Sequence, residues 1–317
     1  MEKATGRRRP VHWLALLFLP LIVGMSGCAT GDETDAERAG LADSRPVVLT
    51  TFTVLQDIAQ NVAGGHLRVE SITKLGAEIH GYEPTPDDLR RASHADLILD
   101  NGLNLEAWFS QFVQENSAPH ITVSDGIEPI GIVQGEGAGK PNPHAWMSPV
   151  NVQRYVGTIA NAFSELDPDN ASDYQANAKA YQTELQKVQD DLMTALEEIP
   201  EQQSVLVTCE GAFSYLARDA GLKEKYLWAV NAESQATPRK VASAIDYLRD
   251  NHVPAVFCES TVSDAAMQRV VESTDAHFGG TLYVDSLSEP GGPVPSYLDL
   301  ITHDTQIIAS ALKGQTS

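Results

Sequence analysis

The feature that most constrains the fold is a repeated alternation of short apolar runs with segments of helical spacing. In the first half, apolar and β-branched runs predict four strands, at 47–52, 67–73, 95–99 and 120–123. In the second half they predict four more, at 204–208, 226–230, 254–258 and 281–284. Helical segments lie between the strands, and this alternation is typical of parallel βαβ units. The sequence therefore predicts an α/β fold with two similar lobes.

A helical segment separates the two sets of strands. Ser148 and Pro149 predict a helix start, since serine caps helices and proline fits the first turn. A longer apolar stripe runs from about Ser172 to Ile199, and a helix of that length would extend about 42 Å. We expect an N-terminal α/β lobe at 47–147, a helical segment with a bridging helix at 148–200 and a C-terminal α/β lobe at 201–317. The two lobes would face each other across a cleft.

The first 46 residues have the composition of an export signal followed by a tether. A basic stretch that ends at Arg9 precedes about 14 apolar residues, a length typical of a signal peptide and short for a membrane span. Met25-Ser26-Gly27-Cys28 then resembles the lipobox of bacterial lipoproteins; the alternative is an ordinary secretory signal with an incidental cysteine. We expect a lipoprotein signal peptide at 1–27, lipidation of Cys28 and a flexible, lipid-anchored tether at 28–46. The body would then lie outside the cytoplasm, anchored to the bacterial cell membrane.

Charge and motif content exclude several classes of function. The chain of 317 residues has 22 Lys and Arg against 43 Asp and Glu, a formal net charge of −21. Such a surface repels phosphate backbones, so nucleic acid is not an expected partner. Three cysteines exclude a four-cysteine zinc site. A metallohydrolase is one alternative, but neither HExxH nor GxSxG is present, and we expect no enzymatic activity.

Residues with metal-binding chemistry follow the predicted strands of both lobes. In open α/β sheets, ligands bind beyond the carboxyl ends of the strands. At these positions the N-terminal lobe has His80 and His144, and the C-terminal lobe has Glu210 and Asp285. Two imidazoles and two carboxylates could therefore meet in the cleft. Glu259 also follows a cysteine at a strand end, so it is a rival of Glu210 or a residue that supports a ligand.

Two cysteines end predicted strands of the second lobe. Cys209 and Cys258 each precede a glutamate. The first and third strands of a doubly wound lobe are neighbours about 4.8 Å apart, within the Cα range of a disulfide. In an oxidising compartment this predicts a Cys209–Cys258 disulfide, and two buried free thiols are the alternative.

Six motifs carry a resemblance that covers most of residues 47–312. They are HGYEPTP at 80–86, ADLILDNGLNLE at 95–106, PHAW at 143–146, EGAFSY at 210–215, ATP at 236–238 and DSL at 285–287. The chain thereby resembles the substrate-binding lipoproteins of transition-metal ABC importers, the cluster A-I family that serves manganese, zinc and iron. The resemblance implies two α/β lobes linked by one long rigid helix, with the metal in the interlobe cleft. It also implies the metal ligands His80, His144, Glu210 and Asp285.

Departures from the family pattern bear on the metal. The family often has acidic residues where this chain has Asn142 and Ser148, which we expect to change the contacts of the ligands rather than ligation. Zinc-specific members often carry a histidine-rich loop before the second ligand and a third histidine in place of Glu210, whereas 131–141 contains no histidine. Two nitrogens with two carboxylates favour manganese(II) or iron(II) over zinc.

Together these features predict a monomeric receptor that captures Mn²⁺, or alternatively Zn²⁺ or Fe²⁺. The resemblance implies that it delivers the ion to a membrane permease driven by an ATPase. A metal-binding surface adhesin is the remaining alternative.

Overall fold

The structure, a computed structural model, describes residues 43–109, 118–135, 137–230 and 236–315. The predicted signal peptide, Cys28 and most of the predicted tether lie outside the described residues. All helices and strands named below belong to one compact unit, Arg45–Ser317. Among the described residues, no helix combines the length and the hydropathy that a membrane span requires.

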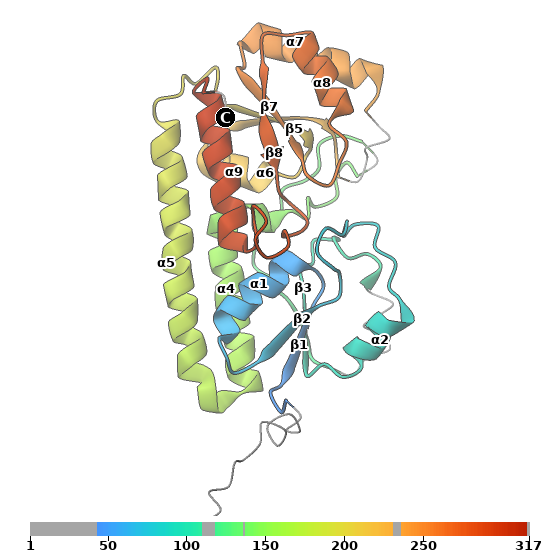
Figure 1. Cartoon of the computed structure of the whole chain (residues 1–317), viewed down its shortest axis with the longest axis vertical. Coiled ribbons are helices and arrows are strands. Elements are labelled where there is room, and N and C mark those ends of the chain that lie inside the picture. The colour runs from blue at the N-terminus through green and yellow to red at the C-terminus, as the bar shows by residue number, and fades with distance from the viewer. Residues whose placement is uncertain (1–42, 110–117, 136, 231–235, 316–317) are drawn as a thin grey trace, which may run out of the picture. The chain divides into compact units, whose positions relative to one another are not determined.

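The N-terminal lobe contains a parallel sheet with the strand order β2-β1-β3-β4 (Figure 1). Its strands are β1 (Val47–Thr50), β2 (Arg68–Ser71), β3 (Leu97–Asp100) and β4 (His120–Thr122). Its helices are α1 (Thr53–Ala63) and α2 (Pro86–Ala92). Apolar residues of α1 recur at helical spacing and are buried, with Leu55, Ile58 and Val62 fully covered. Because all four strands are parallel, their carboxyl ends and the loops that follow lie at one edge of the sheet.

Apolar spacing in the sequence predicts a helix at 103–113, and the described part of this segment differs from that prediction. Residues 103–108 form turns, and Leu103 and Asn104 both have positive φ, at 53° and 65°. Glu106 explains this local conformation, because its carboxylate accepts the backbone N–H groups of Asn101 (2.8 Å) and Gly102 (3.2 Å). The side chain thereby closes a turn that apolar spacing alone does not reveal. Residues 110–113 lie outside the described part of the chain.

The C-terminal lobe has two parallel pairs of strands. The strands are β5 (Val205–Glu210), β6 (Lys223–Trp228), β7 (Ala255–Glu259) and β8 (His277–Leu282), with β5 paired to β6 and β7 paired to β8. The helices are α6 (Ser214–Ala220), α7 (Pro238–Asn251) and α8 (Ala265–Glu272). The two pairs lie side by side at β5 and β7, where the Cα atoms of Cys209 and Cys258 are 4.8 Å apart.

The last strand begins earlier than the sequence predicts, at His277 instead of 281. The start at His277 was not predicted because Gly279 and Gly280 follow it, and glycine is unusual inside a strand. Position 279 has no room for a side chain, because a Cβ on Gly279 would lie 2.5 Å from Phe257 and 2.8 Å from Ala311. Gly280 has a φ of 140°, which other residues rarely adopt. The glycines therefore let β8 pass close to its neighbours.

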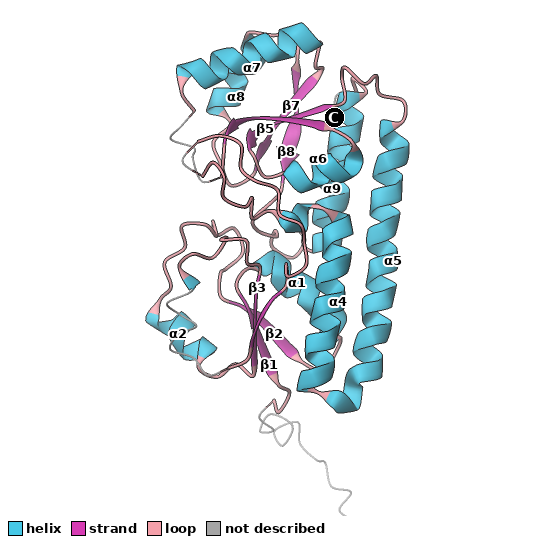
Figure 2. Cartoon of the chain, turned by 180° about the vertical axis from the view of Figure 1, so that it is seen from behind, coloured by secondary structure: helices cyan, strands magenta, loops and turns pink. Residues whose placement is uncertain are grey.

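Long helices cover both lobes on one side (Figure 2). They are α4 (Pro149–Leu166), α5 (Ala171–Leu196) and α9 (Tyr297–Leu312). The short 3₁₀ helix η3 (Pro168–Asn170) connects α4 to α5. Helix α5 has 26 residues and is therefore about 39 Å long. It packs against α1 of the N-terminal lobe and against α6 and α9 of the C-terminal lobe. One continuous helix thus supports both lobes.

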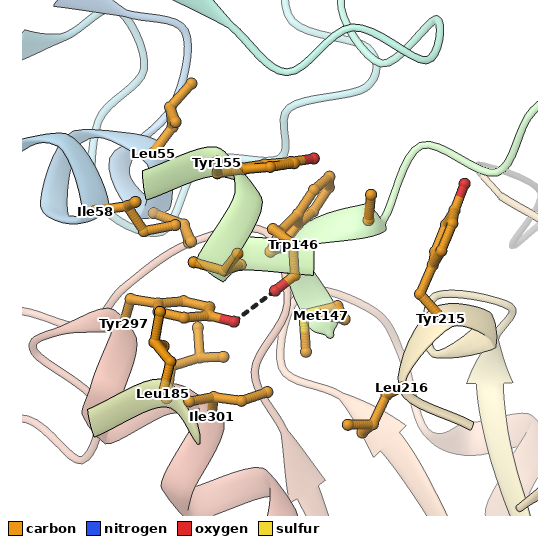
Figure 3. Packing of buried hydrophobic residues seen from close by; sticks show 14 of the residues in the cluster. Leu55, Ile58, Trp146, Met147, Tyr155, Leu185, Tyr215, Leu216, Tyr297 and Ile301 are labelled. Carbon is orange, nitrogen blue, oxygen red and sulfur yellow. Dashed lines mark hydrogen bonds between the residues drawn. The ribbon is translucent and has the colours of Figure 1, made fainter. Parts of the chain in front are cut away.

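The two lobes share one hydrophobic core (Figure 3). Trp146, in the 3₁₀ helix η2 (Ala145–Met147), is fully buried and donates its indole N–H to the carbonyl of Val284 at 3.0 Å. Tyr297 of α9 donates its hydroxyl to the carbonyl of Trp146 at 2.6 Å. Tyr155 and Leu185 pack in the same cluster from α4 and α5. These contacts link the loop after β4 to the segment after β8, so the loops that carry the candidate ligands are held together.

Candidate metal centre

His80 lies in the loop between β2 and α2, and two neighbouring contacts fix that loop. The Glu78 carboxylate accepts the backbone N–H of His80 at 2.7 Å and that of Gly81 at 2.9 Å. Trp108 donates its indole N–H to the carbonyl of Ile79 at 3.2 Å. The His80 side chain is only 3% exposed. A local network of hydrogen bonds therefore holds this imidazole.

His144 precedes η2, and Asn142 fixes its orientation. The Asn142 Oδ1 atom accepts both the His144 backbone N–H (3.1 Å) and the ring Nδ1–H (2.9 Å). The Asn142 amide group points the other way and donates to the carbonyl of Gly211 at 2.6 Å. The backbone groups on both sides determine the amide orientation, which in turn assigns the ring proton to Nδ1. Nε2 of the neutral ring then carries the lone pair that a metal would bind.

The two carboxylates come from the C-terminal lobe. Glu210 is the last residue of β5, and Asp285 follows three residues after the end of β8. Their exposed fractions are 4% and 3%. Asp285 Oδ1 has no hydrogen-bond partner among the described residues. Burial of an unpaired carboxylate oxygen is costly unless a cation or a proton compensates it.

Donor atoms of both histidines and both carboxylates lie near one another between the lobes. The Nε2 atoms of His80 and His144 lie 3.0 Å apart. Glu210 Oε1 lies 3.9 Å from the first Nε2 and 3.8 Å from the second, and Asp285 Oδ1 lies 3.9 Å from each. Donor atoms bound to one ion at about 2.1 Å are separated by about 3.0 Å at a right angle and about 3.4 Å at the tetrahedral angle. The distances from the imidazoles to the carboxylates are longer than these values. Donor atoms of His80, His144 and Asp285 lie within 4.8 Å of one another in the described part of the chain, a set that does not include Glu210, so Glu210 and Asp285 would have to move closer together to bind one ion.

Burial also sets the charge of the site. It lowers the pKa of His80 to about 3, and burial together with the neighbouring His80 ring lowers the pKa of His144 well below its ordinary value. Burial, followed by the nearby Glu78 carboxylate, raises the pKa of Asp285 to about 7. Both imidazoles are therefore neutral at neutral pH, which is the metal-binding form. A bound cation would favour ionised Asp285, because an opposite charge stabilises a carboxylate.

A cavity of about 450 Å³ lies beside Asp285. Its lining includes Glu78, Thr261, Tyr283 and Glu289. The Thr261 hydroxyl donates to Asp285 Oδ2 at 3.4 Å, so the cavity wall contacts the candidate site. Carboxylates at this wall would attract a cation toward Asp285.

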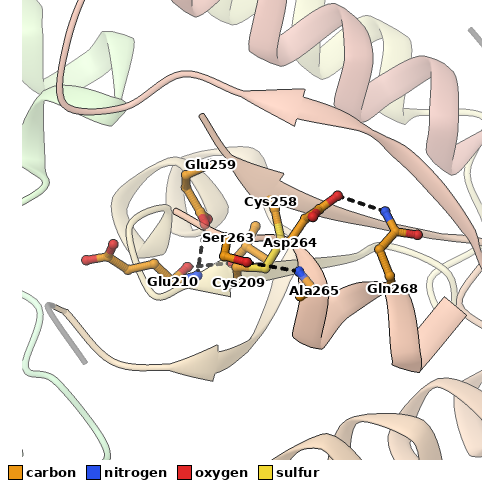
Figure 4. The surroundings of a disulfide bond; sticks show 9 residues. Cys209, Glu210, Cys258, Glu259, Ser263, Asp264, Ala265 and Gln268 are labelled. Atoms are coloured by element: carbon orange, nitrogen blue, oxygen red, sulfur yellow. Dashed lines mark hydrogen bonds between the residues drawn. A yellow bond between two sulfur atoms is a disulfide. The ribbon is translucent and has the colours of Figure 1, made fainter. Parts of the chain in front are cut away.

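The structure contains a Cys209–Cys258 disulfide rather than two free thiols (Figure 4). Both sulfur atoms lie in an apolar cluster, and the residues are 0% and 1% exposed. Glu210 and Glu259 follow directly. The Glu259 carboxylate accepts the backbone N–H of Glu210 at 3.1 Å, so Glu259 contacts a candidate ligand, and its oxygens show no ion pair with the two imidazoles.

The structure thus brings His80, His144 and Asp285 within 4.8 Å of one another and places Glu210 within 3.9 Å of both imidazoles, while Glu259 contacts the backbone of Glu210. Glu78, which holds the His80 loop, and Thr261, whose hydroxyl contacts Asp285, are not among the residues predicted from the sequence. The spacing of Glu78 two residues before His80 offered a signal, since a carboxylate at that spacing can close a turn onto the following N–H groups. No comparable local signal identifies Thr261, because its partner Asp285 is distant in the sequence.

A buried carboxylate behind the His144 loop predicts a pH effect on stability. Ser214 accepts from the Asn142 amide (3.1 Å) and donates to Glu224 at 2.6 Å, while burial raises the pKa of Glu224 to about 7. A raised folded-state pKa stabilises the fold fully below pH 4.5, and this contribution is lost as the pH rises through about 7. For the metal-free chain we expect Glu224 to account for a decrease of about 2 kcal/mol in the free energy of unfolding, allowing for its partial exposure.

Urea unfolding at pH 5 and pH 8 measures this effect. The Glu224→Gln chain should show a smaller loss of stability between the two pH values than the unsubstituted chain. Equal losses would show that Glu224 does not titrate in this range.

The fold and the site define a class of protein: a two-lobed α/β protein with imidazoles and carboxylates that could hold a metal ion between its lobes. Comparison with known proteins identifies the particular family. Residues 48–311 match the family described as zinc-uptake complex component A, periplasmic (ZnuA), so the chain belongs to this family. Its relatives are substrate-binding receptors of metal ABC transporters and not enzymes. The predicted family resemblance, the two-lobed α/β fold and the non-enzymatic class are thus confirmed.

The chain is similar over most of its length to several known proteins and solved structures. The iron-binding protein YfeA of Yersinia pestis is 50% identical over 279 residues, which covers 86% of this chain and 90% of the relative. The manganese ABC transporter substrate-binding lipoprotein PsaA of Streptococcus mitis is 33% identical over 307 residues, covering 94% and 97%. The Mn-bound periplasmic metal binding protein of Candidatus Liberibacter asiaticus has a TM-score of 0.79 at 39% identity, covering 84% and 100%.

A fourth similarity is to the periplasmic zinc binding protein TroA of Treponema pallidum. Its TM-score is 0.77 at 26% identity, and 84% of this chain and 99% of TroA are covered. The names of these proteins specify iron, manganese and zinc. Family membership therefore makes the chain an extracytoplasmic metal-binding receptor of an ABC transporter, with a membrane permease and an ATPase as partners, and leaves the metal open.

Proposed function

We propose that the chain captures Mn²⁺ with His80, His144, Glu210 and Asp285 and delivers it to the permease of an ABC importer. The observation that carries this proposal is the set of four buried donor atoms, contributed equally by the two lobes. The two imidazole Nε2 atoms lie 3.0 Å apart, and each lies 3.8–3.9 Å from an oxygen of Glu210 and of Asp285, close to the spacing of donors around one divalent ion.

The chemistry of the donors supports manganese over zinc. Carboxylates are hard ligands and can bind through both oxygens, so this site can supply more than four bonds, whereas zinc favours four-coordinate sites rich in nitrogen or sulfur. The relative PsaA is named for manganese, and a structural neighbour is described as Mn-bound. Iron(II) is the second candidate, because it prefers similar ligands and the relative with 50% identity is named as iron-binding.

The proposal includes the cellular arrangement of the receptor. A lipid on Cys28 would anchor the mature chain, with residues 28–46 as a tether. The lipobox-like sequence supports this anchor, and the name of the PsaA relative includes the word lipoprotein. The mature chain would act as a monomer, since one copy supplies His80, His144 and Asp285, which lie within 4.8 Å of one another, and also Glu210 beside both imidazoles.

Competitive metal titration of the mature chain tests the proposal. The chain is stripped with a chelator and titrated with Mn²⁺, Fe²⁺ and Zn²⁺, and bound metal per chain is measured by elemental analysis. We expect one ion per chain. Zinc is expected to bind at least as tightly as manganese in solution, because the Irving–Williams order favours it. Uptake of each metal by cells with and without the chain then decides the transported ion; absence of any stoichiometric binding would contradict the proposal.

A further inference from the structure

The turn Glu259–Thr261, at the end of β7, contacts both candidate carboxylate ligands. Glu259 Oε2 accepts the backbone N–H of Glu210 at 3.1 Å, as Figure 4 shows. Two residues later, the Thr261 hydroxyl donates to Asp285 Oδ2 at 3.4 Å. One short turn therefore reaches the carboxylate of β5 and the carboxylate that follows β8.

The backbone of this turn is fixed on both sides. Glu259 pairs with Leu282 in the β7–β8 register, and Ser260 donates its N–H to the carbonyl of Leu282 at 2.8 Å. Leu282 is the last residue of β8, three positions before Asp285. On the other side, the disulfide attaches Cys258 to Cys209, the residue before Glu210. A displacement of the turn would therefore shift both carboxylates.

A glutamate is an unusual residue at a buried position such as 259 if its role is only structural. Glu259 is 2% exposed, and its Oε1 has no hydrogen-bond partner among the described residues. A buried carboxylate with one unpaired oxygen costs stability, while a smaller polar or apolar side chain would avoid that cost. The Glu259 carboxylate lies at the strand end, where its Oε2 accepts the backbone N–H of Glu210, and this contact explains why a glutamate is placed there.

We propose that Glu259 and Thr261 are positioning residues for the metal centre: the turn they form aligns Glu210 and Asp285 toward the two imidazoles. The inference rests on the proposed function. Glu259 acts through the Glu210 backbone, and Thr261 acts through the second oxygen of Asp285, which leaves Oδ1 directed at Nε2 of His80 and His144. Residues that orient metal ligands in this way typically contribute about 10- to 100-fold to affinity.

Two pairs of substitutions test the positioning role in the full mature chain. Glu259→Leu removes the acceptor for the Glu210 N–H, whereas Glu259→Gln keeps one. Thr261→Val removes the donor to Asp285, whereas Thr261→Ser keeps it. We expect Glu259→Leu and Thr261→Val to weaken Mn²⁺ binding about 10-fold or more, and the two conservative variants to stay within about threefold of the unsubstituted chain.

Co²⁺ absorption is the second readout, because its visible bands respond to ligand geometry. The spectrum should change in Glu259→Leu and Thr261→Val and be restored in Glu259→Gln and Thr261→Ser. Thr305→Val is the matched control, since Thr305 donates to the Ile301 carbonyl within α9, away from the site. If Glu259→Leu does not fold, the Thr261 pair decides the outcome.

The outcomes separate this inference from the proposed function. Parent-like Mn²⁺ affinity and Co²⁺ spectra in Glu259→Leu and Thr261→Val would overturn the positioning role while the metal site stands. Equal losses in each substitution and its conservative partner would also overturn it, because the retained hydrogen bond would then be irrelevant. If the unsubstituted chain binds no Mn²⁺ or Co²⁺, the proposed function itself fails.

Discussion

The Asp285→Ala chain is expected to bind Mn²⁺ at least about 100-fold more weakly than the unsubstituted chain, a loss of about 3 kcal/mol or more in binding free energy. The substitution removes one of four donor atoms and one of the two negative charges that compensate the ion. Because the remaining donors are buried, solvent cannot readily replace the lost ligand. His144→Ala should produce a loss of similar size, since its imidazole is fully buried and oriented by Asn142.

Chelator competition measures these affinities, with one matched control for each residue type. Asp299→Ala removes an exposed aspartate in the first turn of α9 that accepts the hydroxyl of the capping Ser296, and His66→Ala removes a histidine that contacts Asp173. Both controls should bind Mn²⁺ like the unsubstituted chain. Parent-like binding by Asp285→Ala or His144→Ala would place the metal elsewhere in the molecule.

The candidate site was predictable to the extent that each residue follows a strand. His80, His144 and Asp285 lie in segments that follow strands and Glu210 ends β5, the edge where α/β folds bind ligands. Local motifs distinguish these residues from other histidines and acids. Their convergence depends on the parallel strands and on a core shared by the two lobes, which hold the loops at facing edges.

The contacts around the ligands could not be predicted in the same way. Cys209-Glu210 and Cys258-Glu259 share the same residue pair, and the EGAFSY motif favours Glu210 as the ligand. The amide that Glu259 accepts, the backbone N–H of Glu210, is visible only in the fold. Asn142 presents the same difficulty, because its amide joins His144 to Gly211 of the opposite lobe. Hydrogen bonds between distant segments leave no periodic signal.

The fold was predictable where apolar spacing determines structure and less so where individual side chains do. The strands and α5 follow from hydrophobic runs and stripes. The turn at Leu103 depends instead on the Glu106 carboxylate, and the start of β8 depends on the space that Phe257 leaves for Gly279. In both cases a tertiary or side-chain contact overrides local propensity.

The Cys209→Ala/Cys258→Ala chain is expected to lose about 4 kcal/mol in free energy of unfolding. The disulfide joins residues 49 positions apart, so its removal releases a long loop in the unfolded chain. Alanine is the suitable replacement, because both cysteines lie in an apolar cluster where a serine hydroxyl would lack a partner. Urea unfolding of the metal-free chain measures the difference.

A control distinguishes the crosslink from packing. The unsubstituted chain unfolded in urea with a dithiol reductant should approach the stability of the double variant, since the reductant converts the unfolded disulfide to two thiols. A difference below about 1 kcal/mol between the oxidised chain and the double variant would contradict the stabilising role.

The expected loss also has a consequence for the site: the crosslink holds β5 against β7 one residue before Glu210, so its removal should loosen the strand end that carries this carboxylate.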